Sequence, residues 1–320
     1  HKTLRTSHKP LTYQTPPQYN NTIEIQDLYV DKRDNLNPRY TFETFIVGPF
    51  NQLAHAAALA VVQRPGITYN PLFIYGRTGH GKTHLIQAIG NTFKKSHTNK
   101  KVFYVTADRF TNDLVNAIRA GRASSFKDHY RQYDVLIMDD IQFIADKEKT
   151  QEELFHLFNS FHDNNKQIIF SSDTHPTDMP GFQDRLKWRF SAGMVAEIPE
   201  PDTESRIAIL KAKADQYHFT FPDDIISYIA ANVTGNIREL EGILNAVICK
   251  SQLKGVGVTV NEVASFIKNA NRANKGVSVV DVVKKISQYY GVEEHSIYEK
   301  TRKKEVVKPR QIIMYILREE

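Results

Sequence analysis

The chain has 320 residues, of which 41% are hydrophobic and 24% charged, with a net charge of +6 and a single cysteine. This composition is typical of a soluble globular protein with two or three domains. One cysteine excludes an internal disulfide framework, and no apolar run approaches the ~18 residues of a membrane span. Together with the absence of a signal-peptide pattern, this predicts a cytoplasmic protein. The chain begins with His1 rather than Met, so we expect either a fragment of a longer protein or a chain with an added tag.

Residues 1–38 are polar and rich in Thr, Gln, Asn and Pro, which predicts a tail or linker. From residue 39 to 203, short apolar runs alternate with helical patterns, which predicts an α/β fold with a five-stranded parallel sheet covered on both faces. The expected strands are Leu72–Tyr75, Val102–Thr106, Val135–Met138, Gln167–Ser172 and Met194–Ile198.

The strand pattern stops after Pro201, and helical periodicity continues to the end of the chain. Residues 204–276 predict a small helical subdomain with a connecting helix. Cys249 follows the apolar residues 246–248 within it, so we expect this side chain in the core. Residues 277–320 predict a second helical unit that is short for a domain, which indicates truncation.

The stretch Gly76–His84, GRTGHGKTH, stands where the first expected strand ends. It could be a phosphate-binding loop, a metal site using His80 and His84, or an ordinary strand-to-helix turn. The spacing of Gly76, Gly81, Lys82 and Thr83 favours the phosphate-binding loop, because glycines let backbone N–H groups surround phosphate oxygens and a helix N-terminus attracts anions. A metal site lacks a third ligand nearby, and a plain turn has no need of Lys-Thr.

Acidic residues follow two of the expected strands. Asp139 and Asp140 end an apolar strand, which could simply be capped by a turn. Two adjacent carboxylates are costly like charges, however, so a cation bound there is the better explanation. Asp139 is expected to hold Mg²⁺, and Asp140 to polarise the attacking water. Asp173 follows the next strand, and is a candidate sensor of the γ-phosphate or the water.

Two arginines and a basic run complete the candidate residues. Arg189 and Arg238 lie beyond the acidic strands, and each could be a surface ion pair or could meet the γ-phosphate. The basic run between Lys300 and Arg310 abuts the apolar periodic segment 312–317. It could be a solvated loop or, beside a helix, part of a nucleic-acid-binding surface.

The order of these features resembles the AAA+ ATPases, and specific motifs resemble the DnaA family of bacterial replication initiators. The similar stretches run in collinear order from Tyr40 to Glu320. They are NPLFIYG, GKTHLIQAIG, IMDDIQFIADKEKTQEEL, SSDTHP, RLKWRF, GNIRELEG and KPRQIIMYILRE. The resemblance implies an AAA+ core with a helical lid and a truncated, all-α, helix-turn-helix-type C-terminal unit.

The resemblance also implies a function and roles for matching residues. It implies an ATPase whose slow hydrolysis resets an origin-binding switch, with ATP or ADP and Mg²⁺ as cofactors. Duplex and single-stranded origin DNA, further copies of the chain, and the replicative helicase machinery, through regions outside this chain, are the implied partners. Phosphate and Mg²⁺ binding is implied for Gly76, Gly79, Gly81, Lys82, Thr83 and Asp139, with the metal on Thr83 and Asp139. Catalytic or sensing roles are implied for Asp140, Asp173, Arg189 as a finger acting on a neighbouring subunit, and Arg238 in the lid.

DNA contacts are implied by the resemblance alone. Those implied for single strands are Val115, Lys147, Lys149 and Thr150. Those implied for duplex are Arg302, Lys303, Lys308, Arg310 and Gln311, with Arg310 in the minor groove.

The chain departs from the family pattern in three places. The loop interior 77–80 lacks the usual small apolar residues, which backbone phosphate binding tolerates. Trp188 and Ala192 are unusual near Arg189 and leave the subunit-interface geometry open. The chain also ends before the motif with which the family contacts the major groove. We therefore expect it to contain only part of the surface that recognises the origin sequence. A helicase loader with the same core, and a DNA-binding module with a vestigial nucleotide site, are the alternatives; measuring ATP hydrolysis with and without DNA would separate them.

Overall fold

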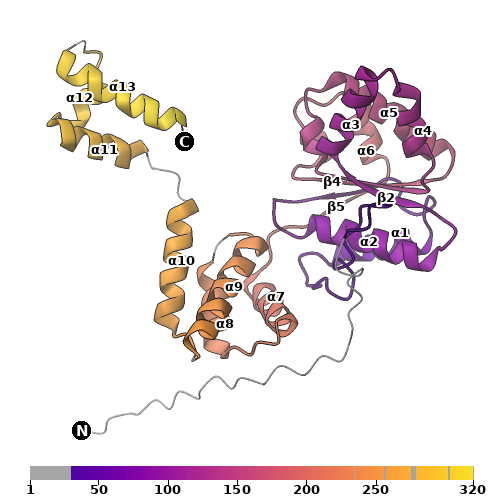
Figure 1. Ribbon diagram of the computed structural model, residues 1–320, viewed down its shortest axis with the longest axis horizontal. Coiled ribbons are helices and arrows are strands. Elements are labelled where there is room, and N and C mark those ends of the chain that lie inside the picture. Colours follow the sequence, from indigo (N-terminus) through magenta and orange to yellow (C-terminus); the bar gives the residue numbers. More distant parts are fainter. Residues whose placement is uncertain (1–29, 234, 256, 275–278, 302, 320) are drawn as a thin grey trace, which may run out of the picture. The chain divides into compact units, whose positions relative to one another are not determined.

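The computed structural model describes residues 30–233, 235–255, 257–274, 279–301 and 303–319 (Figure 1). The chain divides into two compact units, His1–Ile248 and Cys249–Glu320. The division falls inside one helix, whereas the sequence predicted a helical subdomain that extends to residue 276. Within the described ranges, no helix is both long and apolar enough to cross a bilayer.

The first unit is built on a parallel sheet of five strands in the order β2-β3-β4-β1-β5. The strands are β1 (Leu72–Tyr75), β2 (Val102–Thr106), β3 (Val135–Asp139), β4 (Gln167–Ser172) and β5 (Met194–Glu197). The prediction of a five-stranded parallel sheet is confirmed, and two strand ends differ from it by one residue. The central strands β3 and β4 are buried along their whole length, which explains their continuous apolar sequences.

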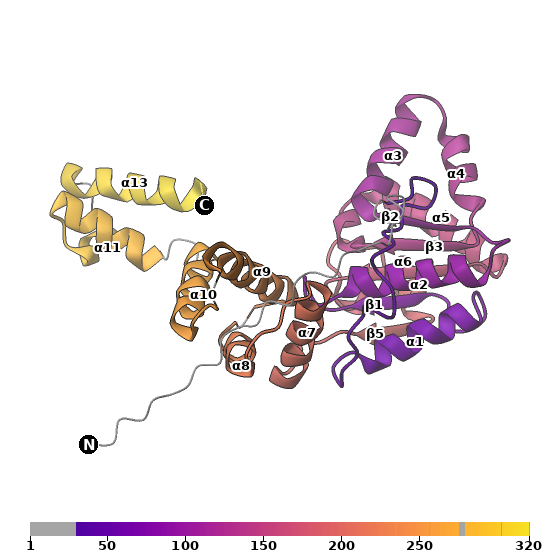
Figure 2. The same ribbon diagram turned by 60° about the horizontal axis from the view of Figure 1, so that its bottom comes forward.

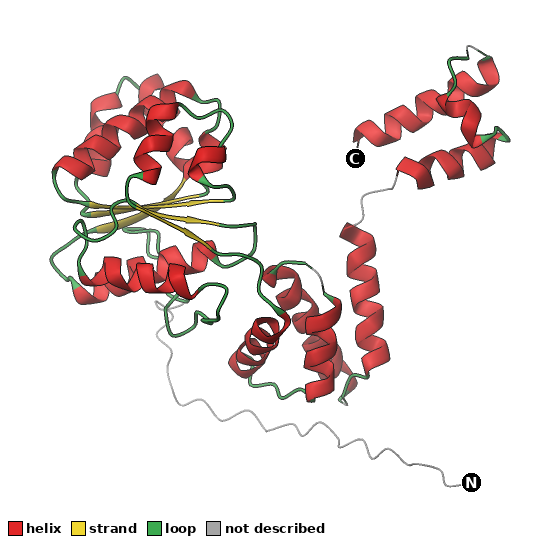
Figure 3. Ribbon diagram, turned by 180° about the vertical axis from the view of Figure 1, so that it is seen from behind, coloured by secondary structure: helices red, strands yellow, loops and turns green. Residues whose placement is uncertain are grey.

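Helices cover both faces of this sheet (Figures 1 and 3). One face carries α1 (Gln52–Gln63) and α2 (Lys82–Ser96), and the other carries α3 (Ala107–Arg119), α4 (Ala123–Arg131), α5 (Glu148–Asp163) and α6 (Asp184–Ser191). Two separate hydrophobic clusters result. Phe93 and Ile137 belong to the first, and the second is rich in aromatic residues such as Phe110, Phe158 and Phe190. The sheet therefore holds its carboxyl-end loops on a rigid three-layer support.

A segment before α1, residues 31–46, packs against α2 and the edge strand β2, and we call it the strap. Leu36 is only 2% exposed within the α2 side of the core. The backbone N–H of Tyr104 donates to the Asp34 carbonyl at 2.8 Å, so the strap also satisfies part of the open edge of β2. Residues 31–38 were predicted as part of a tail; the structure shows them folded onto the sheet.

Three helices follow the sheet, namely α7 (Thr203–Gln216), α8 (Asp223–Asn232) and α9 (Ile237–Lys254) (Figure 2). The Asp202 carboxylate caps α7 by accepting from the Ser205 N–H at 2.7 Å. Arg206 ties α7 to the end of α8, because it donates to the Val233 carbonyl at 2.6 Å. Cys249 is exposed, so the prediction that it lies in the core is wrong: it falls on the solvent side of α9.

The second unit contains the end of α9 and helices α10 (Val260–Asn274), α11 (Val279–Tyr290), α12 (Glu294–Tyr298) and α13 (Lys304–Glu319). The last three share a small core of their own. Its buried members are Val282, Val283, Ile297, Val306 and Ile313. Helix α13 begins at Lys304, inside the basic run, and contains Pro309 in its second turn.

Candidate functional site

The loop between β1 and α2 is shaped by glycines. A Cβ on Gly76 would lie 2.2 Å from the Ile198 carbonyl oxygen, so only glycine lets the chain pass this close to the end of β5. Gly81, at φ 95°, is in the left-handed region immediately before the first helical residue, Lys82. The sequence thus folds into a tight loop that opens onto a helix N-terminus, which is a binding site for anions.

Lys82 is 5% exposed and its ammonium group lies inside this loop. Its Nζ donates to the carbonyl oxygens of Gly76, at 2.6 Å, and Arg77, at 3.2 Å. Burial lowers the pKa of Lys82, whereas the nearby carboxylates, Asp140 first, act to raise it. The loop therefore holds a cation at the position where a bound phosphate would need one.

Asp139 is 1% exposed and accepts hydrogen bonds from three side-chain hydroxyls. Thr83 donates to its Oδ2 at 2.8 Å and Tyr104 to the same oxygen at 2.7 Å, while Ser171 donates to Oδ1. The Thr83 hydroxyl and the Asp139 carboxylate, which the sequence separates by 56 residues, thus come together. Hard oxygen donors of this kind fit Mg²⁺.

Asp140 differs from its neighbour in conformation and exposure. Its φ of 54° is left-handed, which Asp tolerates better than most residues. Its N–H donates to the Ser171 Oγ at 2.9 Å, and the Gln142 amide donates to its Oδ1 at 3.1 Å. Burial, and then the charge of Asp139, raise the pKa of Asp140. The turn thus separates two adjacent carboxylates, one enclosed among hydroxyls and one facing a cavity.

That cavity has a volume of about 170 Å³ and lies between the strap, the loop, α7 and α9. Its polar part includes Lys82, Thr83 and Asp140. Apolar and aromatic side chains form the rest of the wall, namely Tyr40, Phe45, Ile46, Phe50, Ile209 and Ile237. A phosphate loop beside an apolar wall suits a ligand with an anionic end and a flat, less polar end.

Two of the predicted sensors lie beside the loop. Arg238, on α9, lines the same cavity as Lys82, and Asp173 lines an adjoining cavity of about 460 Å³ together with Arg77 and His80. Both act electrostatically on Lys82, Asp173 to raise its pKa and Arg238 to lower it. The structure therefore brings these two residues to the loop from β4 and from the helical subdomain.

Arg189 lies elsewhere. It is half-buried on α6, with its guanidinium carbon 5.9 Å from the ring centre of Phe155 and 5.6 Å from that of Phe158 on α5. It lines neither of the two cavities described above. Its neighbour Trp188 is 77% exposed, and Ala192 is exposed as well. Arg189 thus belongs to a surface away from the loop of its own chain.

The four residues predicted to contact single strands lie on α3 and at the start of α5. Val115 is 38% exposed and Lys149 is exposed, whereas the Lys147 Nζ lies 4.0 Å from Asp108 Oδ1. Thr150 is only 4% exposed, which counts against a contact between its hydroxyl and DNA.

The predicted duplex contacts in the second unit divide in a similar way. Lys303, Lys308 and Gln311 are exposed, and Arg302 lies outside the described residues. Arg310 donates to four carbonyl oxygens of its own unit. The acceptors are Ser296, Ile297, Glu299 and Thr301, at distances of 2.5–3.3 Å. These hydrogen bonds count against the predicted minor-groove contact of Arg310.

Sequence reasoning missed several residues of this site. Tyr104 lies on β2 two residues before the partner of Asp139 in the strand register, Thr106, so its side chain shares the face of Asp139. Ser171 and the strap residues around Phe45 were also missed. A polar side chain near the carboxyl end of an apolar strand is the signal that could have found Tyr104. No local sequence pattern marks the strap.

The loop, the acidic pair at the end of β3 and the strand order, backed by a helical subdomain, define a P-loop nucleotide-binding protein of the AAA+ class. The chain belongs to the bacterial DnaA ATPase family: residues 36–197 match the family described as the bacterial DnaA ATPase domain. Residues 279–320 match the bacterial DnaA helix-turn-helix family.

Similar proteins and similar solved structures also include DnaA proteins. The chromosomal replication initiator protein DnaA of Thermus thermophilus is 46% identical over 288 residues, which are 90% of this chain and 66% of that protein. Domain III of the Thermotoga maritima DnaA crystal structure matches with a TM-score of 0.70 and 42% identity, over 73% of this chain and 98% of that one. A DnaA structure with AMPPCP and single-stranded DNA matches with a TM-score of 0.66 and 36% identity, over 89% of this chain and 84% of that one. The chain spans 66% and 62% of the length of the DnaA proteins of Thermus thermophilus and Deinococcus radiodurans.

Proposed function

We propose that this chain is the ATP-switched part of a chromosomal replication initiator, which binds ATP, assembles on origin DNA, engages a single strand and promotes strand opening. The observation that carries the proposal is the glycine loop itself, which holds the Lys82 ammonium group inside it, with the Thr83 hydroxyl, at the start of the next helix, bonded to the Asp139 carboxylate. A protein with a vestigial site has no need of a buried lysine and a buried carboxylate held in this arrangement, because each is costly to bury.

Residues of the loop and of the end of β3 have separate roles in binding and hydrolysis. ATP would supply the phosphoanhydride and Mg²⁺ would polarise it; Thr83 and Asp139 are the residues that would hold the metal. Lys82 exchanges its carbonyl partners for phosphate oxygens, which are better partners for an ammonium group. Asp140 faces the cavity, and burial raises its pKa. Its carboxylate can therefore polarise a water molecule in the cavity and accept a proton from that water.

Two arginines connect the nucleotide to assembly. Arg238 lines the cavity from α9 and reports on the nucleotide to the helical subdomain. Arg189 is turned away from the loop of its own chain and serves the nucleotide of a neighbouring copy. Slow hydrolysis then reverses the assembly.

DNA is contacted by both units. The single strand lies along Val115, Lys147 and Lys149. A relative whose structure contains AMPPCP and single-stranded DNA supports the binding of a single strand as such. Thr150 is left out of this surface because it is buried. Duplex is held by Lys303, Lys308 and the part of the helix-turn-helix unit that the chain contains. The replicative helicase machinery joins through regions outside this chain.

Arg189→Ala tests the proposal. ATP affinity of the dilute, monomeric protein should stay within about twofold, because the side chain lies outside the cavities of its own loop. ATP-dependent assembly on DNA, measured by light scattering or crosslinking, should be lost. Arg185→Ala is the matched control, since Arg185 lies on the same helix and stacks on the same ring, 4.5 Å from the centre of Phe155. A large fall in monomer affinity, or equal loss of assembly in both variants, would contradict the proposed role.

A further inference from the structure

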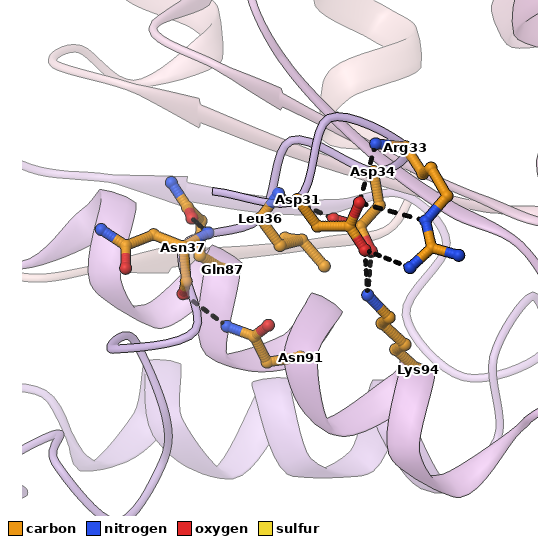
Figure 4. A network of polar contacts seen from close by, with 8 residues as sticks. All are labelled: Asp31, Arg33, Asp34, Leu36, Asn37, Gln87, Asn91 and Lys94. Atoms are coloured by element: carbon orange, nitrogen blue, oxygen red, sulfur yellow. Dashed lines mark hydrogen bonds and ion pairs between the residues drawn. The ribbon is translucent and has the colours of Figure 1, made fainter. Parts of the chain in front are cut away.

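Two side chains link the strap to the buried carboxylate. Gln87 is 4% exposed on α2, and its Oε1 accepts from the Asn37 backbone N–H of the strap at 2.8 Å (Figure 4). The Gln87 amide also lies close to the Tyr104 hydroxyl, and Tyr104 donates to Asp139 Oδ2 at 2.7 Å. A path of polar contacts therefore runs from the strap backbone to the predicted Mg²⁺ ligand.

The polarity of each contact on this path is fixed by chemistry. A backbone N–H can only donate, so Asn37 takes the oxygen of the Gln87 amide and leaves its NH₂ group toward Tyr104. The Tyr104 oxygen therefore faces a donor group, and its single hydroxyl proton is donated to Asp139. The docked strap thus aims the tyrosine proton at the carboxylate.

The strap is held in place by other residues of α2. Asn91 donates to the carbonyl oxygens of Asn37 and Tyr40, both at 2.8 Å. Further along, Lys94 pairs with Asp34 at 2.5 Å and with Asp31 at 3.0 Å (Figure 4). These contacts fix the backbone of Asn37, from which the path of polar contacts begins.

We propose that Tyr104 and Gln87 are positioning residues for Asp139, and that the docked strap sets them so that Mg²⁺ binds tightly. The proposal rests on the proposed function, because it assigns Mg²⁺ to Thr83 and Asp139. Asp139 Oδ2 accepts from Tyr104 and Thr83 together, so the tyrosine holds the carboxylate beside the threonine that ligates the metal. Groups that orient a metal ligand in this way typically change metal affinity about 10- to 100-fold when they are removed.

The test measures ADP affinity of the whole chain by isothermal titration calorimetry, over a series of Mg²⁺ concentrations and in EDTA. Tyr104→Phe should raise the Mg²⁺ concentration needed for half-maximal tightening about tenfold, with affinity in EDTA unchanged within about twofold. Gln87→Glu should act in the same direction, since the new carboxylate still accepts from Asn37 but competes with Asp139 for the tyrosine proton. If Tyr104→Phe does not fold, Gln87→Glu decides the outcome.

Tyr130→Phe is the matched control. Tyr130 is 1% exposed and also lies close to a carboxylate, that of Asp113, but on the other face of the sheet. It should leave the Mg²⁺ dependence unchanged. Equal Mg²⁺ curves for Tyr104→Phe and Tyr130→Phe, or equal weakening by Tyr104→Phe with and without Mg²⁺, would overturn the positioning role alone. Failure of the unsubstituted chain to bind ADP would overturn the proposed function as well.

Discussion

The loop of the first unit and the basic helix of the second both contain the clustered cations expected of anion-binding surfaces, yet they use them differently. Lys82 is buried, and the carboxylates and carbonyls around it are themselves held by hydrogen bonds. Lys303 and Lys308 are exposed, and the best-held cation of that unit, Arg310, is bonded to the chain itself. The loop is thus preorganised for a ligand. In the second unit, the exposed lysines carry charge at the surface, while Arg310 holds neighbouring parts of the unit together.

This difference predicts how substitutions should act. A buried, preorganised group has no substitute, so its loss should remove one function almost completely. An exposed cation is one of several that contact phosphates, so its loss should reduce affinity by a small factor and alter its salt dependence. The four substitutions below test this contrast, from the largest expected effect to the smallest.

Lys82→Ala should lower affinity for ATP at least about 100-fold, because a phosphate contact from a buried ammonium is charge-assisted and nothing nearby replaces it. A fluorescent ATP analogue measures this in a direct titration. Lys101→Ala, at an exposed lysine before β2, is the control and should bind like the unsubstituted chain. Submicromolar ATP affinity in Lys82→Ala would contradict the claim that the buried lysine of the loop has no substitute.

Asp140→Asn should slow hydrolysis about 100-fold or more and leave ATP binding nearly intact, since the amide cannot take a proton from water. Steady-state phosphate release and analogue titration separate the two effects. Burial raises the pKa of Asp140, so this carboxylate takes up a proton at a higher pH than an ordinary carboxylate does. When the solution is acidified, the hydrolysis rate of the unsubstituted chain should therefore begin to fall at that higher pH.

The same shift has a consequence for stability. A carboxyl whose folded pKa is raised binds protons more tightly when folded, so stability is lost as pH rises through that folded pKa. Asp140→Asn should therefore raise the melting temperature of the nucleotide-free protein at pH 7. Unchanged hydrolysis together with an unchanged melting temperature would move the water-activating role to another residue.

The parts predicted correctly from the sequence are those that depend on local patterns. Five apolar runs became five strands because continuous burial needs continuous apolar sequence. The glycine loop followed from spacing alone, since Gly76 and Gly81 occupy positions that other residues cannot. Asp139 was found because it ends such a run.

The parts that were missed depend on partners far away in the sequence. Tyr104 meets a carboxylate 35 residues later, and the Asn37 backbone meets an amide 50 residues later. Arg310 lies in a basic run typical of a DNA surface, but its partners are carbonyl oxygens 9–14 residues earlier. No local pattern distinguishes such an arginine from its exposed neighbours.

Arg310→Lys sharpens the contrast within the second unit. A lysine keeps the charge but cannot reach the four carbonyl oxygens, so the α12–α13 region should lose about 1–3 kcal/mol of stability. Hydrogen exchange of α12 and α13 amides in the whole chain measures this loss. Lys308→Arg is the control, and ATP affinity should not change in either variant. Normal exchange with a selective fall in duplex affinity would restore Arg310 as a DNA contact.

Lys149→Ala should have the smallest effect and tests the exposed side of the comparison. Lys149 is exposed near the start of α5, and one lost phosphate contact should weaken single-strand binding about three- to tenfold. The slope of log affinity against log salt concentration should fall by about 0.7, the value expected for one contact to a single strand. Fluorescence anisotropy with labelled oligonucleotides and an ATP analogue, at several salt concentrations, measures both quantities, with Lys101→Ala as the control. Duplex affinity should stay the same, because the proposed duplex contacts lie in the other unit; equal loss for both kinds of DNA would show that one surface serves both.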